Sequence, residues 1–253
     1  MVRVHEVLAQ DHHLPLAYST LTRWVREAEL RGPPRRAGSY TFEPGQEMHH
    51  DTSPHRVEMA GRSVSAQCAS LVLAYSRRLF VRYYPRFTRF EAKAFLADAF
   101  AFFDGTCPRC VIDNTSVLVV SGAGADATFA PEMVAFARAY GSAFWAHAVG
   151  HADRKARVER PFAYIEGNFL AGRSFEDWND LNAQALAWCT DTANTKTKRA
   201  LGMSPEAAYV LEKPHLINLP EHRPPVYQVF ERIVDVTGFV CLDTVCGVHE
   251  YVE

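Results

Sequence analysis

The sequence predicts an α/β fold in which helices cover a mixed sheet. Residues 47–85 contain three stretches typical of strands, and residues 88–190 alternate between helical and strand-like patterns. Strands interleaved with helices are typical of proteins whose sheet is covered by helices. Hydrophobic residues make up 48% of the 253 residues and aromatic residues 12%, which is enough for a sizeable core and argues against a disordered chain.

The first forty residues have the pattern of a partial helix-turn-helix and a linker. Leu21, Trp24, Val25 and Ala28 have the spacing of an amphipathic helix over residues 17–30, with Ser19 or Thr20 as its N-cap. The Leu-Pro-Leu at 14–16 indicates a turn after an earlier helix, as in the last two elements of a helix-turn-helix. An ordinary surface helix is the alternative. Residues 31–47 are rich in Pro, Gly and Arg and predict a linker.

The predicted sheet begins with short strands. The first covers residues 47–51 and ends at Asp51, while residues 66–76 and 78–85 are rich in branched and aromatic side chains and predict a hairpin. Thr88 is expected to cap a helix through Phe103. Cys110-Val-Ile then predicts a buried strand that leads directly into Asp113.

Further helices are expected after this strand. Residues 121–130 form a Gly- and Ala-rich loop, Pro131 begins a helix through Tyr140, and a strand follows near 143–147. Another helix lies within 147–170 and begins late or bends at Pro161. Its predicted apolar face consists of Val158, Phe162, Ile165 and Phe169. The sequence also predicts a helix from a cap at Ser174 to about Thr190, one over 203–211 capped by Ser204, and strands in the tail with Gly238 at a turn.

Three carboxylates occupy the ends of these elements. Asp51 ends the first strand, Asp113 ends the fourth, and Glu159 lies at or near the start of the helix after the fifth. If the first and fourth strands are neighbours, the three side chains converge, and their mutual repulsion requires a cation. Oxygen ligands suit Mg²⁺ or Mn²⁺, and two such ions support phosphoryl transfer. Taken alone, an Asp at the end of a strand is usually a turn or cap residue.

Two other groups of possible metal ligands are weaker candidates. Cys107 and Cys110 form a single CxxC, which is more typical of a turn at a strand entry than of a zinc site. His49, His50 and His55 flank Asp51, but strand alternation places His49 and His50 on opposite faces. Six cysteines are too few for a disulfide scaffold, and the sequence contains neither a secretory signal nor a run of 18 apolar residues. We therefore expect a cytoplasmic protein with no membrane span.

Basic residues form local clusters although the net charge is −2. Such clusters bind phosphates when they converge on one face, and otherwise they are solvated surface. The candidates for DNA contact are Arg23, Arg26, Lys155, Arg157 and Arg160.

The segments HHDTSPH, CVIDNTSV and DRKARVERPFAYIEGNFLAGRSFEDW resemble the catalytic segments of IstA-type transposases of bacterial insertion sequences. The stretches SLVLAYSRRLFVRYYPRFTRFEAKAFL and LGMSPEAAYVLEKPHLI are similar to the same family, so that the resemblance covers roughly residues 15–245. It implies a ribonuclease H-like core with a DDE triad, formed here by Asp51, Asp113 and Glu159. Glu166 is the nearest competing glutamate, but it lies outside the V-E-R-P-F motif.

The resemblance also implies an activity and partners. The expected reaction is metal-dependent cleavage at transposon ends and strand transfer into target DNA, with two Mg²⁺ or Mn²⁺ ions. The expected partners are terminal-repeat and target DNA, an IstB-type AAA+ ATPase helper, and further copies of the chain on nucleoid DNA. The expected units are a partial helix-turn-helix and linker (1–40), the catalytic core (41–195), and a C-terminal helix with the start of a β-barrel (196–253).

The chain departs from the family pattern at both ends. It opens with only part of a helix-turn-helix, and CLDTVCGVHEYVE stops where family members continue into a small β-barrel. A truncated copy is the resulting expectation. The alternatives to an active transposase are a non-transposing DNA-binding or interfering fragment and, less well matched, a general ribonuclease H-like nuclease such as a resolvase.

Overall fold

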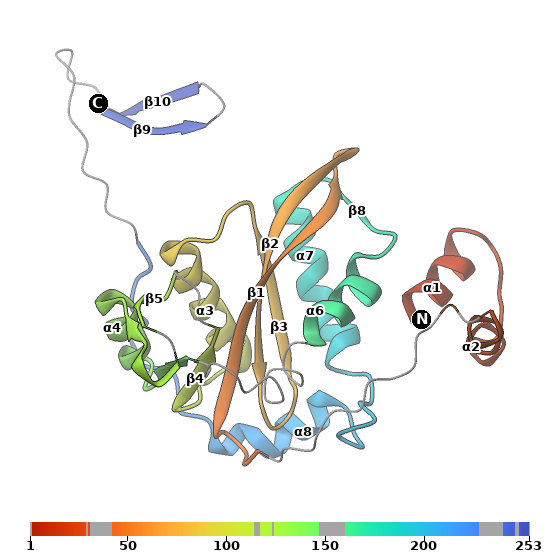
Figure 1. The fold of residues 1–253 in the computed structure, drawn as a ribbon, viewed down its shortest axis with the longest axis horizontal. Coiled ribbons are helices and arrows are strands. Elements are labelled where there is room, and N and C mark those ends of the chain that lie inside the picture. Colours follow the sequence, from red (N-terminus) through yellow and green to blue (C-terminus); the bar gives the residue numbers. More distant parts are fainter. Residues whose placement is uncertain are drawn as a thin grey trace.

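A mixed sheet forms the centre of the protein, which is described here by a computed structural model (Figure 1). The structure describes residues 2–28, 30, 42–113, 117–122, 124–146, 160–227, 240–245 and 248–252. The sheet has the strand order β3-β2-β1-β4-β7. Its strands are β1 (Glu47–Met59), β2 (Arg62–Leu73), β3 (Leu79–Tyr84), β4 (Arg109–Ile112) and β7 (Ala143–Ala146).

The directions of these strands define the fold class. β1, β2 and β3 are antiparallel neighbours, whereas β4 and β7 run parallel to β1. Three antiparallel strands followed by parallel strands on the far side of β1 are the arrangement of a ribonuclease H-like sheet. The predicted α/β class with a mixed sheet is therefore confirmed.

β1 is much longer than the predicted strand over 47–51. It pairs with β2 from Met48↔Leu73 to Met59↔Arg62, and the hairpin closes through Ala60 and Gly61, whose φ angles are 49° and 72°. Positive φ at both central residues is the geometry of a type I′ hairpin turn. The prediction ended the strand too early because residues 52–56 are mostly polar and hide the apolar alternation that Val57 and Met59 resume.

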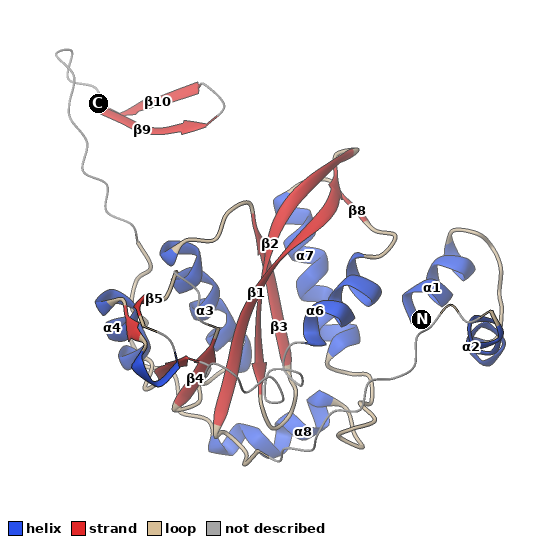
Figure 2. Cartoon of the chain, in the orientation of Figure 1, coloured by secondary structure: helices blue, strands red, loops and turns tan. Residues whose placement is uncertain are grey.

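Helices cover both faces of the sheet (Figure 2). α3 (Arg89–Phe103) and α4 (Pro131–Ala139) pack on one face, where Phe95, Phe100 and Phe136 join one apolar cluster. α6 (Arg160–Ile165) and α7 (Trp178–Trp188) pack on the other, where Ile165 and Leu181 join a second cluster. The predicted cap of α3 at Thr88 is confirmed, and Glu91 completes a capping box with it. The predicted helix at Pro131 is also confirmed.

The helix predicted from a cap at Ser174 begins later. Ser174 and Phe175 form β8, which pairs with Glu58 and Met59 at the end of β1, so this segment is extended. The true N-cap of α7 is Asp177, whose side chain accepts a hydrogen bond from Asp180 N at 2.8 Å. After α7 the chain continues in a π-helical turn, Cys189–Ala193, and a similar turn, Glu166–Leu170, continues α6.

The predicted loop over 121–130 contains short elements. β5 (Val119–Ser121) pairs with β6 (Thr128–Phe129), and a 3₁₀ turn (Gly124–Asp126) lies between them. Gly122 has a φ of 74°, and a Cβ there would lie 2.1 Å from the Asp126 carbonyl oxygen. Strands of this length carry too few residues for periodicity to reveal them.

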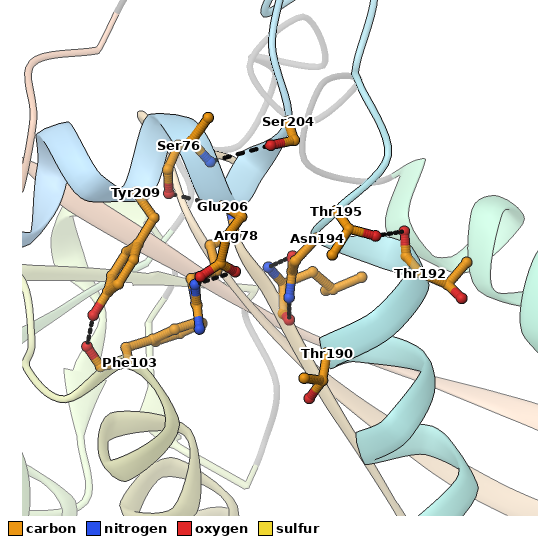
Figure 3. A network of polar contacts seen from close by, with 12 residues as sticks. Ser76, Arg78, Phe103, Thr190, Thr192, Asn194, Thr195, Ser204, Glu206 and Tyr209 are labelled. Carbon is orange, nitrogen blue, oxygen red and sulfur yellow. Dashed lines mark hydrogen bonds and ion pairs between the residues drawn. The ribbon is translucent and has the colours of Figure 1, made fainter.

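Two asparagines cover the outer edge of β3. The side-chain amide of Asn194 accepts from Leu79 N at 2.8 Å and donates to Leu79 O at 2.9 Å (Figure 3). Asn182 on α7 makes the same pair of bonds with Tyr83, at 2.8 and 3.0 Å. An edge strand otherwise presents unpaired backbone groups to other chains. The amide side chains therefore replace a further strand at this edge.

α8 (Pro205–Glu212) lies across one end of the sheet (Figure 1). Its predicted cap is confirmed, because Ser204 Oγ accepts from Ala207 N at 3.1 Å. Arg78 pairs with Glu206 at 2.6 Å, and the Tyr209 hydroxyl donates to the Phe103 carbonyl oxygen (Figure 3). The fully buried Glu212 carboxylate accepts from Gly45 N at 3.2 Å and Ser76 N at 3.0 Å, and so fixes α8 to two turns of the sheet. A 3₁₀ turn, Lys213–His215, follows.

The N-terminal segment forms two helices, α1 (Val2–Gln10) and α2 (Tyr18–Glu27). α2 has Ala17 as its N-cap without a side-chain bond, so the predicted caps Ser19 and Thr20 lie inside the helix. α1 contacts the body of the protein through an ion pair of 3.5 Å between Glu6 and Lys196.

At the other end of the chain, β9 (Val240–Val245) and β10 (Val248–Val252) form an antiparallel hairpin, which agrees with the predicted strand character. The predicted turn at Gly238 lies outside the described residues. Within the described ranges, no helix is long and apolar enough to cross a bilayer.

Candidate active site

Asp51 on β1 and Asp113, directly after β4, lie at corresponding positions of two neighbouring strands. β1 and β4 pair in parallel from Glu47↔Arg109 to His50↔Ile112. Asp51 and Asp113 are the next residues of the two strands, one position beyond the last pair. Both are half-buried. In a parallel pair, partners in register project to the same face of the sheet. The Asp51 and Asp113 carboxylates therefore lie on the same face of the sheet, at the end of β4.

The face of β1 that carries Asp51 is the face covered by α6 and α7. Met48 packs in the cluster formed with α3, and the His50 ring lies 5.1 Å from that of Phe95 on α3. Val57 and Met59 pack instead in the cluster that contains Ile165 of α6. Because side chains alternate along a strand, the odd-numbered residues, including Asp51, lie on this second face. The Asp51 carboxylate accepts a hydrogen bond from Thr52 N at 2.8 Å.

Glu159, the third predicted carboxylate, lies outside the described residues, as do Lys155 and Arg157. Arg160 is the first residue of α6, and its side chain is not among those described. Glu159 thus directly precedes a helix that packs on the face of Asp51.

Glu166, the competing glutamate, has a different partner. His55 Nδ1 lies 3.0 Å from Glu166 Oε1. Among the side chains that the structure describes, no three His, Cys, Asp or Glu groups are close enough to hold a metal ion. In the part of the chain that the structure describes, Glu166 is thus paired with His55 and is not grouped with both Asp51 and Asp113.

A buried polar cluster lies below the two aspartates on the same face, and the sequence reasoning did not find it. His49 Nε2 lies 2.7 Å from Glu47 Oε1, and both side chains are 3% exposed. Arg109 on β4 reaches Glu47 at 3.5 Å and stacks over the Trp145 ring of β7 at 4.4 Å. These contacts join β1, β4 and β7 beneath Asp51 and Asp113. In the sequence, this cluster could have been recognised from the alternation of polar residues at 47, 49 and 51.

The histidines beside Asp51 do not converge. His49 contacts Glu47 on one face, whereas His50 is buried on the other and bonds the Ser70 carbonyl oxygen at 3.0 Å. Burial lowers the pKa of His50 to about 4, against a partial rise from that hydrogen bond. His49 and His50 therefore cannot share one metal ion, as strand alternation predicted.

The CxxC cysteines are both buried free thiols. Burial raises the pKa of Cys107 and of Cys110. A thiol held in its protonated form is a poor metal ligand.

Arg23 and Arg26, the N-terminal candidates for DNA contact, are exposed on α2. Arg23 pairs with Glu27 at 3.9 Å one turn later, and both side chains are more than half exposed. Their guanidinium groups face solvent and are accessible to a large partner.

A ribonuclease H-like sheet, with Asp51 on its first strand and Asp113 directly after the neighbouring fourth strand, defines the fold class of this protein. Sequence comparison gives the relatives. The chain is 26% identical over 204 residues to a transposase for insertion sequence element IS21 from Pseudomonas aeruginosa, covering 80% of this chain and 52% of that protein. It is 25% identical over 189 residues to a transposase for insertion sequence element IS640 from Shigella sonnei, covering 74% and 60%. No family model matches the chain.

The chain is thus related to transposases of insertion sequences, and the resemblance seen in its motifs is confirmed. It spans between about half and three fifths of the length of these relatives. Among solved structures, it is similar to the HTLV-2 integrase catalytic core domain in complex with magnesium, with a TM-score of 0.44 and 13% identity over 67% of this chain and 99% of that one.

Proposed function

We propose that this chain contains the catalytic core of a DDE-type DNA transposase, which cleaves DNA at the ends of an insertion sequence and joins them to target DNA. The observation that carries the proposal is the register of β1 and β4. In this register, Asp51 and Asp113 each come directly after a residue of the last pair, His50↔Ile112. The relationship to insertion-sequence transposases supports the choice of substrate.

The two aspartates suit a divalent metal centre. Two half-buried carboxylates in neighbouring positions repel each other, and a cation removes that repulsion. Carboxylate oxygens are the ligands that Mg²⁺ and Mn²⁺ prefer. We assign Asp51, Asp113 and Glu159 as the ligands. Two ions held there would activate a water or a 3′-hydroxyl and stabilise the leaving oxygen of a phosphodiester.

The protein's own contribution is to hold these carboxylates in place. Asp51 is fixed by the β1–β2 and β1–β4 ladders and by its bond to Thr52 N. Below it, the cluster of Glu47, His49 and Arg109 joins the two strands that carry the aspartates. Rigid strands position ligands more accurately than loops do.

The proposed partners follow from this activity. DNA would contact Arg23 and Arg26 on α2, and Lys155, Arg157 and Arg160 near the site. α1 and α2 would form the last two elements of a helix-turn-helix. By resemblance to the IstA-type family, we include an IstB-type AAA+ ATPase helper and assembly of several copies on DNA.

A cleavage and strand-transfer assay tests the proposal. The substrate is a duplex that carries the inverted repeats flanking the gene, incubated with Mg²⁺ or Mn²⁺ and the helper ATPase. Asp113→Asn is expected to lower the rate by at least about a thousandfold, because it removes a charge that holds the cations. Asp126→Asn, which changes an exposed aspartate in the 3₁₀ turn, is the matched control and should retain the wild-type rate.

Cleavage that persists in Asp113→Asn would reject the proposed chemistry. Binding of the terminal repeats without cleavage by the wild type, under conditions in which a related transposase is active, would favour the alternative of a non-transposing DNA-binding fragment.

A further inference from the structure

We propose that His55 and Glu166 form a positioning pair, which sets α6 and its continuation at a defined height and rotation against β1. His55 Nδ1 and Glu166 Oε1 are 3.0 Å apart, and the two residues are 111 positions apart in sequence. The inference rests on the proposed function, because Arg160, the first residue of α6, directly follows the proposed metal ligand Glu159.

The pair lies in the interface between the sheet and α6. The His55 side chain is 1% exposed. Its ring lies 5.6 Å from that of Phe162 on α6 and 6.5 Å from that of Tyr83 on β3. His55 lies on the same face of β1 as Asp51, four residues further along, or about 13 Å. The contact therefore joins the strand that carries one proposed ligand to the helix that follows another.

Packing alone does not account for a polar pair at this place. A buried imidazole loses its hydration, and His55 Nε2 is buried without a hydrogen-bond partner among the described residues. The Glu166 side chain is 62% exposed and contributes little apolar burial. An apolar side chain at position 55 would pack against Phe162 without these costs. Polar contacts at such costs are known to specify orientation in some proteins.

A hydrogen bond specifies position more narrowly than the neighbouring apolar contacts. The apolar contacts of Phe162 are non-directional, whereas the bond from His55 to Glu166 weakens steeply as its angle departs from the ideal geometry. Glu166 lies in the π-helical turn directly after α6, seven residues from Glu159. Residues 160–166 are helical, so a shift of Glu166 is transmitted over about 10 Å to the start of α6, which directly follows Glu159 in sequence. Misplacement of a reacting group by about 1 Å costs up to a hundredfold in rate.

The test compares variants at position 166 with a control at an exposed glutamate. Glu166→Ala removes the acceptor, whereas Glu166→Gln keeps an oxygen that accepts the same hydrogen bond. Glu176→Ala is the control, because Glu176 is also exposed and lies just before α7. Each variant is assayed for strand-transfer kcat, for KM toward DNA, and for Mn²⁺ binding without DNA by electron paramagnetic resonance. Thermal melting checks that each variant is folded.

Glu166→Ala is expected to lower kcat and to weaken Mn²⁺ binding, each by about tenfold, with little change in KM. Glu166→Gln should recover most of both losses, and Glu176→Ala should match the wild type. His55→Phe, which fills the same aromatic space without a donor, should reproduce the losses and serves if Glu166→Ala does not fold.

Wild-type kcat and Mn²⁺ binding in folded Glu166→Ala and His55→Phe would overturn the positioning role. That outcome differs from failure of the proposed function, in which Asp113→Asn leaves both Mn²⁺ binding and activity unchanged.

Discussion

His50 and His55 are both buried on β1, but on opposite faces of the sheet. Burial lowers the pKa of each. His50 has a backbone carbonyl as its partner, and its pKa is about 4. His55 faces Glu166, whose carboxylate raises the pKa and so opposes the larger effect of burial. Burial is therefore the larger effect on the pKa of both rings, and the partner on each face opposes it.

At the residue scale, we predict that Glu166→Gln lowers the pKa of His55 further, because the variant loses the charge that favours imidazolium. The unfolded chain binds a proton near pH 6.5, whereas the folded chain binds it at lower pH. Folding stability therefore decreases as the pH falls below about 6.5, and it should decrease more steeply in the variant.

An NMR titration of the imidazole resonances, together with urea unfolding at pH 5 and 7.5, measures both effects. Among the described residues, the Tyr83 ring also lies against His55, and burial raises the pKa of Tyr83, so Tyr83 stays neutral throughout this range. Glu176→Gln should leave the titration unchanged. A higher pKa of His55 in Glu166→Gln would contradict the prediction.

The sequence could indicate candidate site residues but not their partners. Asp51 and Asp113 were proposed because each follows or ends a predicted strand and matches a motif. Glu47 and Arg109 were missed because their pairing depends on the β1–β4 register, which is not encoded in either strand alone. The bond from His55 to Glu166 was missed because it depends on how α6 and its continuation pack against β1.

At the scale of elements, the sequence predicted the start of a helix correctly where a local capping residue or proline determines it. Thr88, Pro131 and Ser204 mark the starts of helices as expected. Ser174 did not, because pairing of β8 with the end of β1 keeps that residue extended. β1 itself was predicted too short because residues 52–56, directly after Asp51, are mostly polar. Tertiary pairing overrode the local pattern in both places.

The asparagines on the edge of β3 provide an element-scale prediction. Asn194→Ala should lower the free energy of unfolding by about 2–4 kcal/mol, because it leaves both backbone groups of Leu79 without a partner in a buried place. Asn182→Ala should cost less, since Asn182 is only half-buried and water can replace its amide.

Urea unfolding of the two variants measures the difference, with Asn179→Ala on the outer part of α7 as the control. A smaller loss for Asn194→Ala than for Asn182→Ala would show that burial does not set the cost at this edge.

At the scale of the whole molecule, the segment after residue 195 is joined to the sheet by several kinds of contact. Glu212 bonds two backbone N–H groups at the turns before β1 and after β2. Thr106 and Ile217 form a β-bridge, and Lys213 pairs with Asp104 at 2.6 Å. The sequence placed α8 outside the catalytic unit of 41–195, since its helical pattern gives no sign of what its buried carboxylate reaches.

We therefore predict that a fragment of residues 41–195 does not unfold cooperatively, whereas 41–219 does. The shorter fragment leaves Gly45 N and Ser76 N without the Glu212 carboxylate, at a cost of about 1–3 kcal/mol each, and exposes apolar surface beneath α8. Circular dichroism melts of both fragments measure this. Glu212→Gln in the longer fragment, which replaces one acceptor oxygen by a donor, should melt cooperatively at a lower temperature than its parent. A cooperative melt of 41–195 at the temperature of 41–219 would mean that α8 is an appendage of the core and not part of it.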